Sequence, residues 1–227
     1  MTKQKNRKSE VNVEEALTTS EAFLVKNKKN LIGGLIAIIL IISGVMIYKN
    51  VYAAPKEKKA QAAIFIGEEY FNNGQYELAL NGDSIRFDGL IRVADQFSGT
   101  KTANLANYYI GLSYGNLEQY ENAVKYLEKF TAKDQMVYPA SRVALGNYYA
   151  ELDNLDKAIS TLKDAAKIAD NLTISTTALR QAGILLEKQG KYKEAVEVYQ
   201  TVKDKYFQSP IAMDIDKYIE RAKAQMN

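Results

Sequence analysis

The hydrophobic residues of this chain follow two patterns. One uncharged run extends from Leu31 to Tyr48, between Lys29 and Lys49. From about Lys56 onward, apolar positions recur with the spacing of amphipathic helices, and the sequence reads as helical without a break. We therefore expect an all-α chain in which one apolar N-terminal helix precedes a helical domain.

The uncharged run is long enough to cross a membrane. Its eighteen residues would rise ~27 Å as a helix, close to the ~30 Å hydrocarbon core of a bilayer. A buried helix of a soluble domain would need some polar face, and this run offers only Ser43. We therefore predict a transmembrane helix over residues 31–48. The spacing Gly33-x-x-x-Ala37 would also let two copies pack closely, so a homo-oligomer is compatible with the sequence.

The charges beside the run bear on its orientation. Lysines flank it on both sides, at Lys26, Lys28 and Lys29 before it and at Lys49, Lys56, Lys58 and Lys59 after it. The local count therefore does not favour an inside N-terminus. Large C-terminal domains are translocated regardless of their charge, however, and the tail adds further basic residues, Lys3, Lys5, Arg7 and Lys8. We expect a cytoplasmic N-terminus and an exported C-terminal domain.

A cleaved signal peptide is the competing interpretation. Val51-Tyr52-Ala53, just before Ala54, is an acceptable cleavage site of small residues. The segment ahead of the run would however be long and would contain four acidic residues, and the run exceeds the usual apolar core of about 7–15 residues. We therefore interpret the run as a retained anchor.

The segments on either side of the run are polar. Residues 1–30 are expected to form a basic, mostly disordered cytoplasmic tail, in which Ser20 can cap a short amphipathic helix. Residues 49–59 are expected to form a basic juxtamembrane linker, and Pro55 fits the first turn of the helix that follows.

The composition argues against catalysis. The 227 residues include no Cys, His or Trp, which removes thiol nucleophiles, imidazole bases and metal sites built from those ligands. Phosphate-binding glycine motifs are absent, and paired carboxylates such as Glu68-Glu69 suit a solvated helix face. We expect a chain that is not an enzyme, with no catalytic residues, metal, cofactor or small-molecule substrate.

The charges are unevenly distributed along the chain. Residues 1–59 hold 11 of the 30 basic residues and 5 of the 27 acidic ones, so residues 60–227 hold 19 basic and 22 acidic residues. The basic charge beside the run suits anionic lipid headgroups. The helical domain has no basic excess with which to neutralise phosphates, so we expect no nucleic-acid partner.

A pattern of small and aromatic residues occurs four times beyond residue 60. Its glycines are 44, 35 and 37 residues apart, at Gly67, Gly111, Gly146 and Gly183. Its alanines keep the same intervals, at Ala79, Ala123, Ala158 and Ala195. In a helical hairpin, such small residues stand where the first helix (helix A) and the second (helix B) approach closely, while Tyr or Leu fills the space between adjacent repeats.

This pattern resembles the tetratricopeptide repeat, whose period is about 34 residues. The third unit, residues 142–166, matches best, with Leu145-Gly146, Tyr149, Ala158, Leu162 and Ala165 at the motif positions. The second unit (108–130) and the fourth (179–202) also match. The expected fold is therefore an all-α, tetratricopeptide-like solenoid of about four repeats over residues 60–210, closed by a capping helix within residues 211–227.

The first unit, residues 63–80, begins with the motif and then loses it. Asp83 and Arg86 stand where the family has an apolar and a small residue. We expect a turn at Asn81-Gly82-Asp83-Ser84 and an additional helix over about residues 88–97, which would fill the extra length of this unit.

The resemblance implies a protein-binding groove lined by the A helices. Carried over repeat by repeat, its lining positions are Ile64, Phe65, Glu68, Phe71 and Asn72; Leu105, Tyr108, Tyr109, Leu112 and Asn116; Val143, Asn147 and Glu151; and Arg180, Gln181, Ile184 and Lys188. The first half of this set is apolar and aromatic, which suits apolar segments of another protein. Alternatively, Tyr108 or Phe71 packs inward. Some members of the family bind a C-terminal carboxylate through polar and basic residues at four positions. In this chain those positions hold Ile64, Glu68, Ala140 and Ala144, so binding of a carboxylate in this way is disfavoured.

The layout as a whole resembles the ancillary Sec-translocon subunits of bacteria, and especially those of Bacteroidetes-type bacteria. The resemblance implies a single-span protein of the bacterial inner membrane with its repeat domain on the periplasmic side. It also implies a non-catalytic, chaperone-like adaptor whose partners are translocon subunits or exported proteins, while Leu31 to Tyr48 contacts membrane lipid. The alternative is a scaffold for envelope assembly or cell division that uses the same groove.

Overall fold

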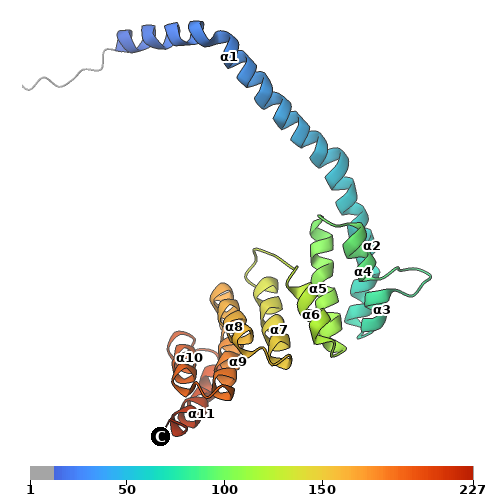
Figure 1. The fold of residues 1–227 in the computed structure, drawn as a ribbon, viewed down its shortest axis with the longest axis vertical. Coiled ribbons are helices and arrows are strands. Elements are labelled where there is room, and N and C mark those ends of the chain that lie inside the picture. The colour runs from blue at the N-terminus through green and yellow to red at the C-terminus, as the bar shows by residue number, and fades with distance from the viewer. Residues whose placement is uncertain (1–12, 227) are drawn as a thin grey trace, which may run out of the picture. The chain divides into compact units, whose positions relative to one another are not determined.

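The computed structural model describes residues 13–226, and every regular element in that range is helical (Figure 1). The predicted all-α class is therefore confirmed. The chain divides into two compact units, residues 1–55 and residues 56–227, and each is described by itself. We call the second one the repeat unit.

The N-terminal unit contains α1 (Val13–Ile47), followed by a six-residue π-helix (Tyr48–Ala53). The expectation of a mostly disordered tail is wrong for residues 13–30, and residues 1–12 lie outside the described range. Ser20 is inside α1, so the helix does not begin there. The sequence Glu14-Glu15-Ala16-Leu17 consists of strong helix formers, which explains why the helix begins before Ser20.

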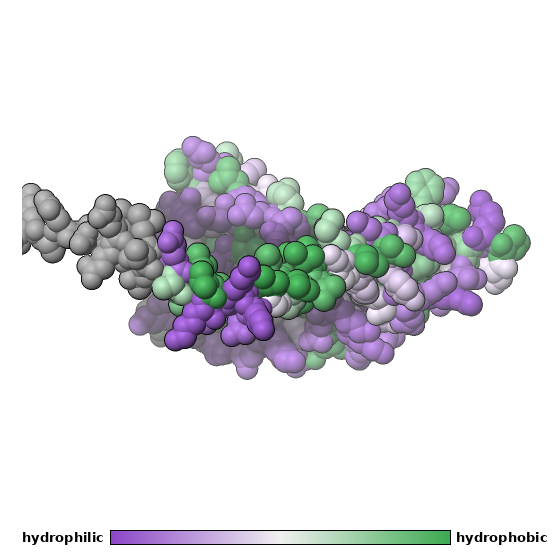
Figure 2. All heavy atoms as spheres, turned by 90° about the horizontal axis from the view of Figure 1, so that it is seen from above, coloured by the Kyte–Doolittle hydropathy of each residue, from purple (hydrophilic) through white to green (hydrophobic). Residues whose placement is uncertain are grey.

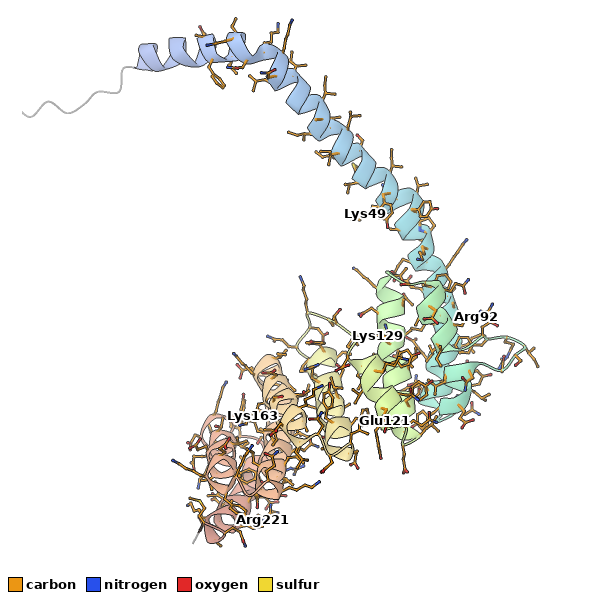
Figure 3. The ribbon with its side chains drawn as sticks, in the orientation of Figure 1. Lys49, Arg92, Glu121, Lys129, Lys163 and Arg221 are labelled. Atoms are coloured by element: carbon orange, nitrogen blue, oxygen red, sulfur yellow. The ribbon has the colours of Figure 1, made fainter. Side chains whose placement is uncertain are left out.

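The uncharged run forms the C-terminal half of α1, and its apolar side chains are exposed, as the hydrophobic surface in Figure 2 illustrates. Within the described range one helix, Glu21–Asn72, is long and apolar enough to span a membrane, and its most apolar window has no buried residue. The chain therefore carries one long apolar helix near its N-terminus, of the kind that serves as an anchor or as a signal sequence. Lys49 is the first charged residue after the run (Figure 3).

The π-helix precedes a proline. The backbone N–H of Ala54 donates to the carbonyl of Lys49, five residues back. Pro55 has no N–H, and in a regular α-helix its ring would collide with the carbonyl four residues earlier. A widened turn directly before Pro55 relieves this conflict. The helix therefore continues through Pro55, where a new helix was expected to begin.

The repeat unit is an array of helical hairpins. Its A helices are α2 (Ala54–Asn72), α5 (Lys101–Asn116), α7 (Val137–Glu151) and α9 (Ile174–Lys188). The B helices of the second, third and fourth repeats are α6 (Tyr120–Leu127), α8 (Leu155–Ala169) and α10 (Tyr192–Lys205). From α3 (Tyr76–Asn81) onward, each helix contacts the next along the chain, as expected for a solenoid (Figure 1).

Each A helix contributes a glycine to its contact with helix B. A Cβ atom added to Gly111 would lie 2.6 Å from Cγ of Leu127, and one added to Gly146 would lie 2.7 Å from Cγ of Leu162. The ring of Tyr199 obstructs Gly183 in the same way. A side chain at any of these positions would force the facing Leu or Tyr side chain, or the hairpin itself, to move, which confirms the predicted close approach of helices A and B.

The first repeat has its B helix in two pieces, α3 (Tyr76–Asn81) and α4 (Leu90–Gln96). Leu90, seven residues after Asp83, occupies the place against Gly67 that Leu127 occupies against Gly111, with its Cγ 2.7 Å from the added Cβ. The helix expected over about residues 88–97 is therefore present as α4, but it is not additional to the hairpin. It is the second half of a B helix that is interrupted by residues 82–89, and the predicted turn at residues 81–84 begins this loop.

Asp83 organises the loop. Its Oδ1 atom accepts hydrogen bonds from the backbone N–H groups of Arg86 (2.7 Å) and Phe87 (2.9 Å), and its Oδ2 atom accepts one from the Tyr70 hydroxyl (2.7 Å). The Tyr70 hydrogen bond and these backbone donors hold the pKa of Asp83 well below its ordinary value. The resulting stabilisation is present above the ordinary pKa of an aspartate and is lost as the pH falls through the lowered one.

The array ends with α11 (Pro210–Ala224). The Ser209 hydroxyl accepts a hydrogen bond from the Ala212 N–H (3.1 Å) and so caps this helix. Its buried residues, Ile215, Ile219 and Ala222, join the core of the last repeats. On the surface, Arg221 (Figure 3) binds the Glu187 carboxylate of α9 through two nitrogens at 2.8 and 2.9 Å.

The replacement of Leu90 by alanine tests the interrupted helix. Leu90 is fully buried, so we expect Leu90→Ala to lower the free energy of unfolding by about 2–5 kcal/mol, as for other buried leucines. Ile85→Ala is the matched control, because Ile85 lies in the same loop region and is 91% exposed. Denaturant unfolding of both variants measures the difference. Equal, small effects would show that α4 does not complete the first hairpin.

Candidate protein-binding surface

The A helices form one face of the array, and this face contains two shallow recesses. The first, of about 380 Å³, lies between α2 and α5, with Ile64 and Glu68 on one side and Leu105 on the other. Gln61, Glu57, Lys101 and Thr102 complete its lining. Ile64 is only 5% exposed, so it forms the floor of the recess, and the expectation of an open groove position there is corrected.

The second recess, of about 330 Å³, lies between α7 and α9. Asn147 and Glu151 of α7 line it together with Gln181 and Ile184 of α9, so four of the predicted groove residues meet here. Ala150 and Leu185 complete the lining. Ile184 is 39% exposed and offers an apolar contact between polar neighbours.

Aromatic rings contact one another on both sides of Tyr109, and Phe71, Tyr108 and Tyr109 are the members that belong to the predicted groove. Phe71 of α2 contacts Tyr109 edge-on, with ring centroids 5.2 Å apart, and Tyr109 contacts Tyr108 at 5.4 Å. Tyr76 extends the series beyond Phe71, while Phe130 and Tyr138 extend it beyond Tyr108. The contacts among Tyr76, Phe71, Tyr109 and Tyr108 are edge-on, a favourable arrangement for aromatic pairs, and the two contacts of Phe130 are tilted. The six rings thus form one continuous aromatic series across the first three repeats.

The predicted aromatic residues are neither fully open nor fully buried. Phe71 and Tyr109 pack against the core of the first repeat, and Tyr108 and Leu112 pack against the core between α6 and α7. All four keep part of their surface exposed. The structure therefore lies between the two alternatives for Tyr108 and Phe71, because each ring contributes to the core and also leaves part of its surface accessible.

Glu68 and Tyr109 face each other across α2 and α5. Partial burial raises the pKa of Glu68, while a hydrogen bond with the Tyr109 hydroxyl acts in the opposite direction. The pKa of Tyr109 is itself raised by burial and by the negative charge of Glu68. The first recess therefore contains a carboxylate that is less well solvated than an ordinary surface glutamate.

The far end of the surface is polar. The Oε1 atom of Gln181 is buried and has no hydrogen-bond partner within residues 13–226. Lys188 pairs with Asp153 at 3.1 Å, and the Asn116 side chain bonds to the carbonyl of Leu112 in its own helix. This end thus offers hydrogen-bonding groups at Asn147 and Glu151 of the second recess, while the Gln181 oxygen is buried beneath it.

The remaining predicted groove residues line neither recess. Phe65 is 67% exposed and Asn72 is exposed at the end of α2. Val143 packs against the core of the third and fourth repeats, and Arg180 is half-buried. The predicted set therefore comprises two recess groups and an aromatic series between them, with several members outside both recesses.

Some lining residues were not predicted from the sequence. Gln61 and Ala150 hold groove positions of their A helices by the repeat register, so the register could have found them. Glu57 could not be found in this way, because its role depends on a contact between repeats: its carboxylate accepts from the backbone N–H of Lys101 (2.8 Å) and of Thr102 (3.1 Å).

Among the described residues, no group of three or more acidic side chains is arranged to hold a metal ion. The surface therefore consists of apolar and aromatic contacts, a few amides and scattered charges. Such a lining is suited to binding segments of another protein.

Comparison with known families supports the repeat assignment. A tetratricopeptide-repeat family model matches residues 105–134 and 177–209, and a second such model matches residues 139–172. The matched segments fall in the second, fourth and third repeats of the structure. The first repeat, which carries the loop of residues 82–89, falls outside both matches. No curated protein matches the chain.

Two crystal structures of one repeat protein show the same fold. A crystal structure of nearly identical TPR-like repeats from a kinesin-light-chain-like protein of Podosopora anserina is 16% identical, with a TM-score of 0.55, over 74% of this chain and 86% of that one. A single-residue variant of that protein gives the same values. The crystal structure of MamA is 18% identical over 71% of this chain and 94% of that one, with a TM-score of 0.47. Repeats of this fold are typically non-catalytic scaffolds.

The Tyr109 hydroxyl sets the ionisation of Glu68, which can be tested by titration. In Tyr109→Phe the carboxylate loses a donor while its burial persists, so we expect the pKa of Glu68 to rise further above its ordinary value. Tyr108→Phe is the control and should leave the Glu68 pKa unchanged. Carbon-detected NMR of the Glu68 carboxyl measures both. An unchanged or lowered pKa in Tyr109→Phe would contradict the proposed contact.

Proposed function

We propose that this chain, a tetratricopeptide-repeat protein, is a non-catalytic, membrane-anchored adaptor that binds segments of other proteins along its A-helix face. The finer proposal is a chaperone-like factor that works beside the Sec translocon on exported proteins. The observation that carries the adaptor function is the aromatic series between the two recesses, because it offers a preformed apolar surface to another chain.

The aromatic series has the properties of a binding surface for apolar segments. Phe71, Tyr109 and Tyr108 are held by edge-on contacts and remain partly exposed, so little side-chain entropy is lost when a partner covers them. Aromatic residues are also enriched at the centres of protein interfaces. At the polar end, Asn147 and Glu151 of the second recess offer polar groups to a bound segment.

The order of the segments supports the finer proposal. A basic N-terminal segment, one apolar helix and a tetratricopeptide array follow one another as in the ancillary translocon subunits that the sequence resembles. An anchor at residues 31–48 would confine the repeats to the membrane surface. Confinement raises the effective concentration for partners at that surface, so weak contacts with many exported chains are sufficient.

Photo-crosslinking in living cells identifies the partner. A photoreactive amino acid at Gln61 or at Ile184 would project from the first or the second recess. We expect it to capture translocon subunits together with assorted exported proteins, identified by mass spectrometry. A probe at Lys193, which is exposed on α10, is the matched control and should capture neither.

Other outcomes of this experiment are equally decisive. One envelope-assembly or cell-division protein, captured in constant ratio from both recesses, would favour the scaffold function over the chaperone-like one. Identical products from the recess probes and from Lys193 would contradict binding along the A-helix face.

The orientation is tested by thiol labelling, because the chain contains no cysteine. Glu21→Cys and Lys193→Cys are both at exposed positions. In intact spheroplasts, we expect an impermeant maleimide to label Lys193→Cys and not Glu21→Cys. The reverse pattern would overturn the orientation. The mass of the mature protein provides the second readout, since loss of residues 1–53 would show that the apolar run is a cleaved signal peptide.

A further inference from the structure

The turns that lead from one repeat into the next lie at one edge of the repeat unit, where the chain enters it. Lys56 Nζ donates to the carbonyl of Ser98 (2.7 Å), and Glu57 accepts from the backbone N–H of Lys101 (2.8 Å). The start of α2 is thus bound to the turn between α4 and α5. We call this edge the leading edge, and it comprises residues 97–101, 129–137, 167–173 and 205–209.

Contacts join the successive turns of the leading edge. The side chain of Asn104 bonds to the backbone of Thr131 at 2.7 and 3.0 Å, which connects the first turn to the second. Tyr138 and Ile168 line one recess, which brings the second turn beside the end of α8. Lys205 and the Tyr206 hydroxyl both bind Asp170, at 2.7 and 2.9 Å, which connects the third turn to the fourth.

Large apolar side chains are exposed along the leading edge. Met136 is 64% exposed, Leu172 is 42% exposed and Phe207 is 66% exposed, one in each of three successive turns. Val137 and Ile168 add further exposed apolar surface beside them. The opposite edge consists of residues 72–76, 116–120, 151–155 and 188–192, and among these described residues no large apolar side chain is exposed. Exposed apolar residues in these turns are therefore specific to one edge.

The leading edge also has a positive charge excess. It contains five lysines, Lys101, Lys129, Lys133, Lys167 and Lys205, and two acids, Asp134 and Asp170. Both acids are engaged: Asp134 accepts from the backbone N–H of Met136 (2.8 Å), and Asp170 binds Lys205. Residues 60–227 together have more acidic than basic residues, so the lysines are concentrated at this edge against the overall balance.

Chain length limits the distance between the apolar run and Lys56, where the repeat unit begins. Tyr48 ends the run, and Lys56 follows eight residues later. Eight residues reach at most about 28 Å even when fully extended. Exposed apolar side chains interleaved with lysines are what a protein surface needs in order to bind anionic headgroups and to insert shallowly among them.

We propose that the leading edge is a second membrane-contact site, which binds the surface of a bilayer that contains anionic phospholipid. Met136, Leu172 and Phe207 enter the boundary between headgroups and acyl chains, and the lysines bind lipid phosphates. The proposal rests on the proposed membrane anchor at residues 31–48. It adds that the repeat unit lies against the same membrane instead of moving freely on its linker.

Fluorescence quenching in vesicles tests this contact with the full-length chain. A polarity-sensitive fluorophore is attached to Gln208→Cys, which is exposed beside Phe207. In vesicles of phosphatidylcholine and phosphatidylglycerol, we expect a blue shift of its emission and quenching by brominated lipid. Both effects should be largely lost in pure phosphatidylcholine. Asn154→Cys, exposed at the opposite edge, is the matched control and should be unaffected.

Charge reversal and an anchor probe separate the possible failures. Lys133→Glu combined with Lys167→Glu should abolish the quenching at Gln208→Cys, while Lys188→Glu combined with Lys191→Glu should not.

A fluorophore at Ile39→Cys reports the anchor itself. If Ile39→Cys is quenched and Gln208→Cys behaves like Asn154→Cys, the docking proposal is overturned and the anchor stands. If Ile39→Cys is not quenched, both proposals fail. Crosslinking of the leading edge to a protein, without lipid quenching, would also overturn the proposal.

Discussion

In each repeat a glycine of helix A lies directly against a large side chain of helix B. Gly111 and Gly146 face leucines, and Gly183 faces the ring of Tyr199. Because this contact sets the distance between the two helices, it also sets the angle at which the next hairpin is added. The recesses and the aromatic series on the A-helix face are consequences of that spacing, since they occupy the space between successive A helices.

The first repeat shows that the constraint concerns contact in space, not position in the sequence. Asp83 follows Gly67 at the same distance in the sequence as Leu127 follows Gly111, but an aspartate is too polar for a site between two helices. Leu90, which comes after the loop, packs against Gly67 instead. The loop is stable because its polar groups are paired among themselves, with Asp83 and Tyr70 at its centre. The interval of 44 residues between Gly67 and Gly111 thus reflects an ordinary hairpin with seven added residues.

The repeats could be predicted from the sequence because Gly and Ala recur at matching intervals. Each of these small residues is needed where helices A and B approach closely. The interrupted helix could not, since only the structure shows that Leu90 returns to the site opposite Gly67. Part of the candidate surface was predictable in the same way. The repeat register predicted groove positions at Asn147 and Ile184, and in the structure both residues line the second recess. The burial of Ile64 and the ring contacts of Tyr109 depend on neighbouring repeats, and periodicity does not specify these contacts.

The loop of residues 82–89 shows where this architecture accepts added sequence. The backbone N–H of Asp83 bonds to the carbonyl of Phe87 at 3.0 Å, and positive φ angles at Gly82 and Gly89 allow the two ends of the loop to touch. The alignment of α3 and α4 therefore does not depend on the length of the loop. The entropic cost of closing the loop also increases only slowly as residues are added. An insertion at Ile85 would separate Asp83 from the N–H groups of Arg86 and Phe87, so an inserted sequence must supply its own donors to Asp83, while the contact between the two ends of the loop still holds α3 and α4 together.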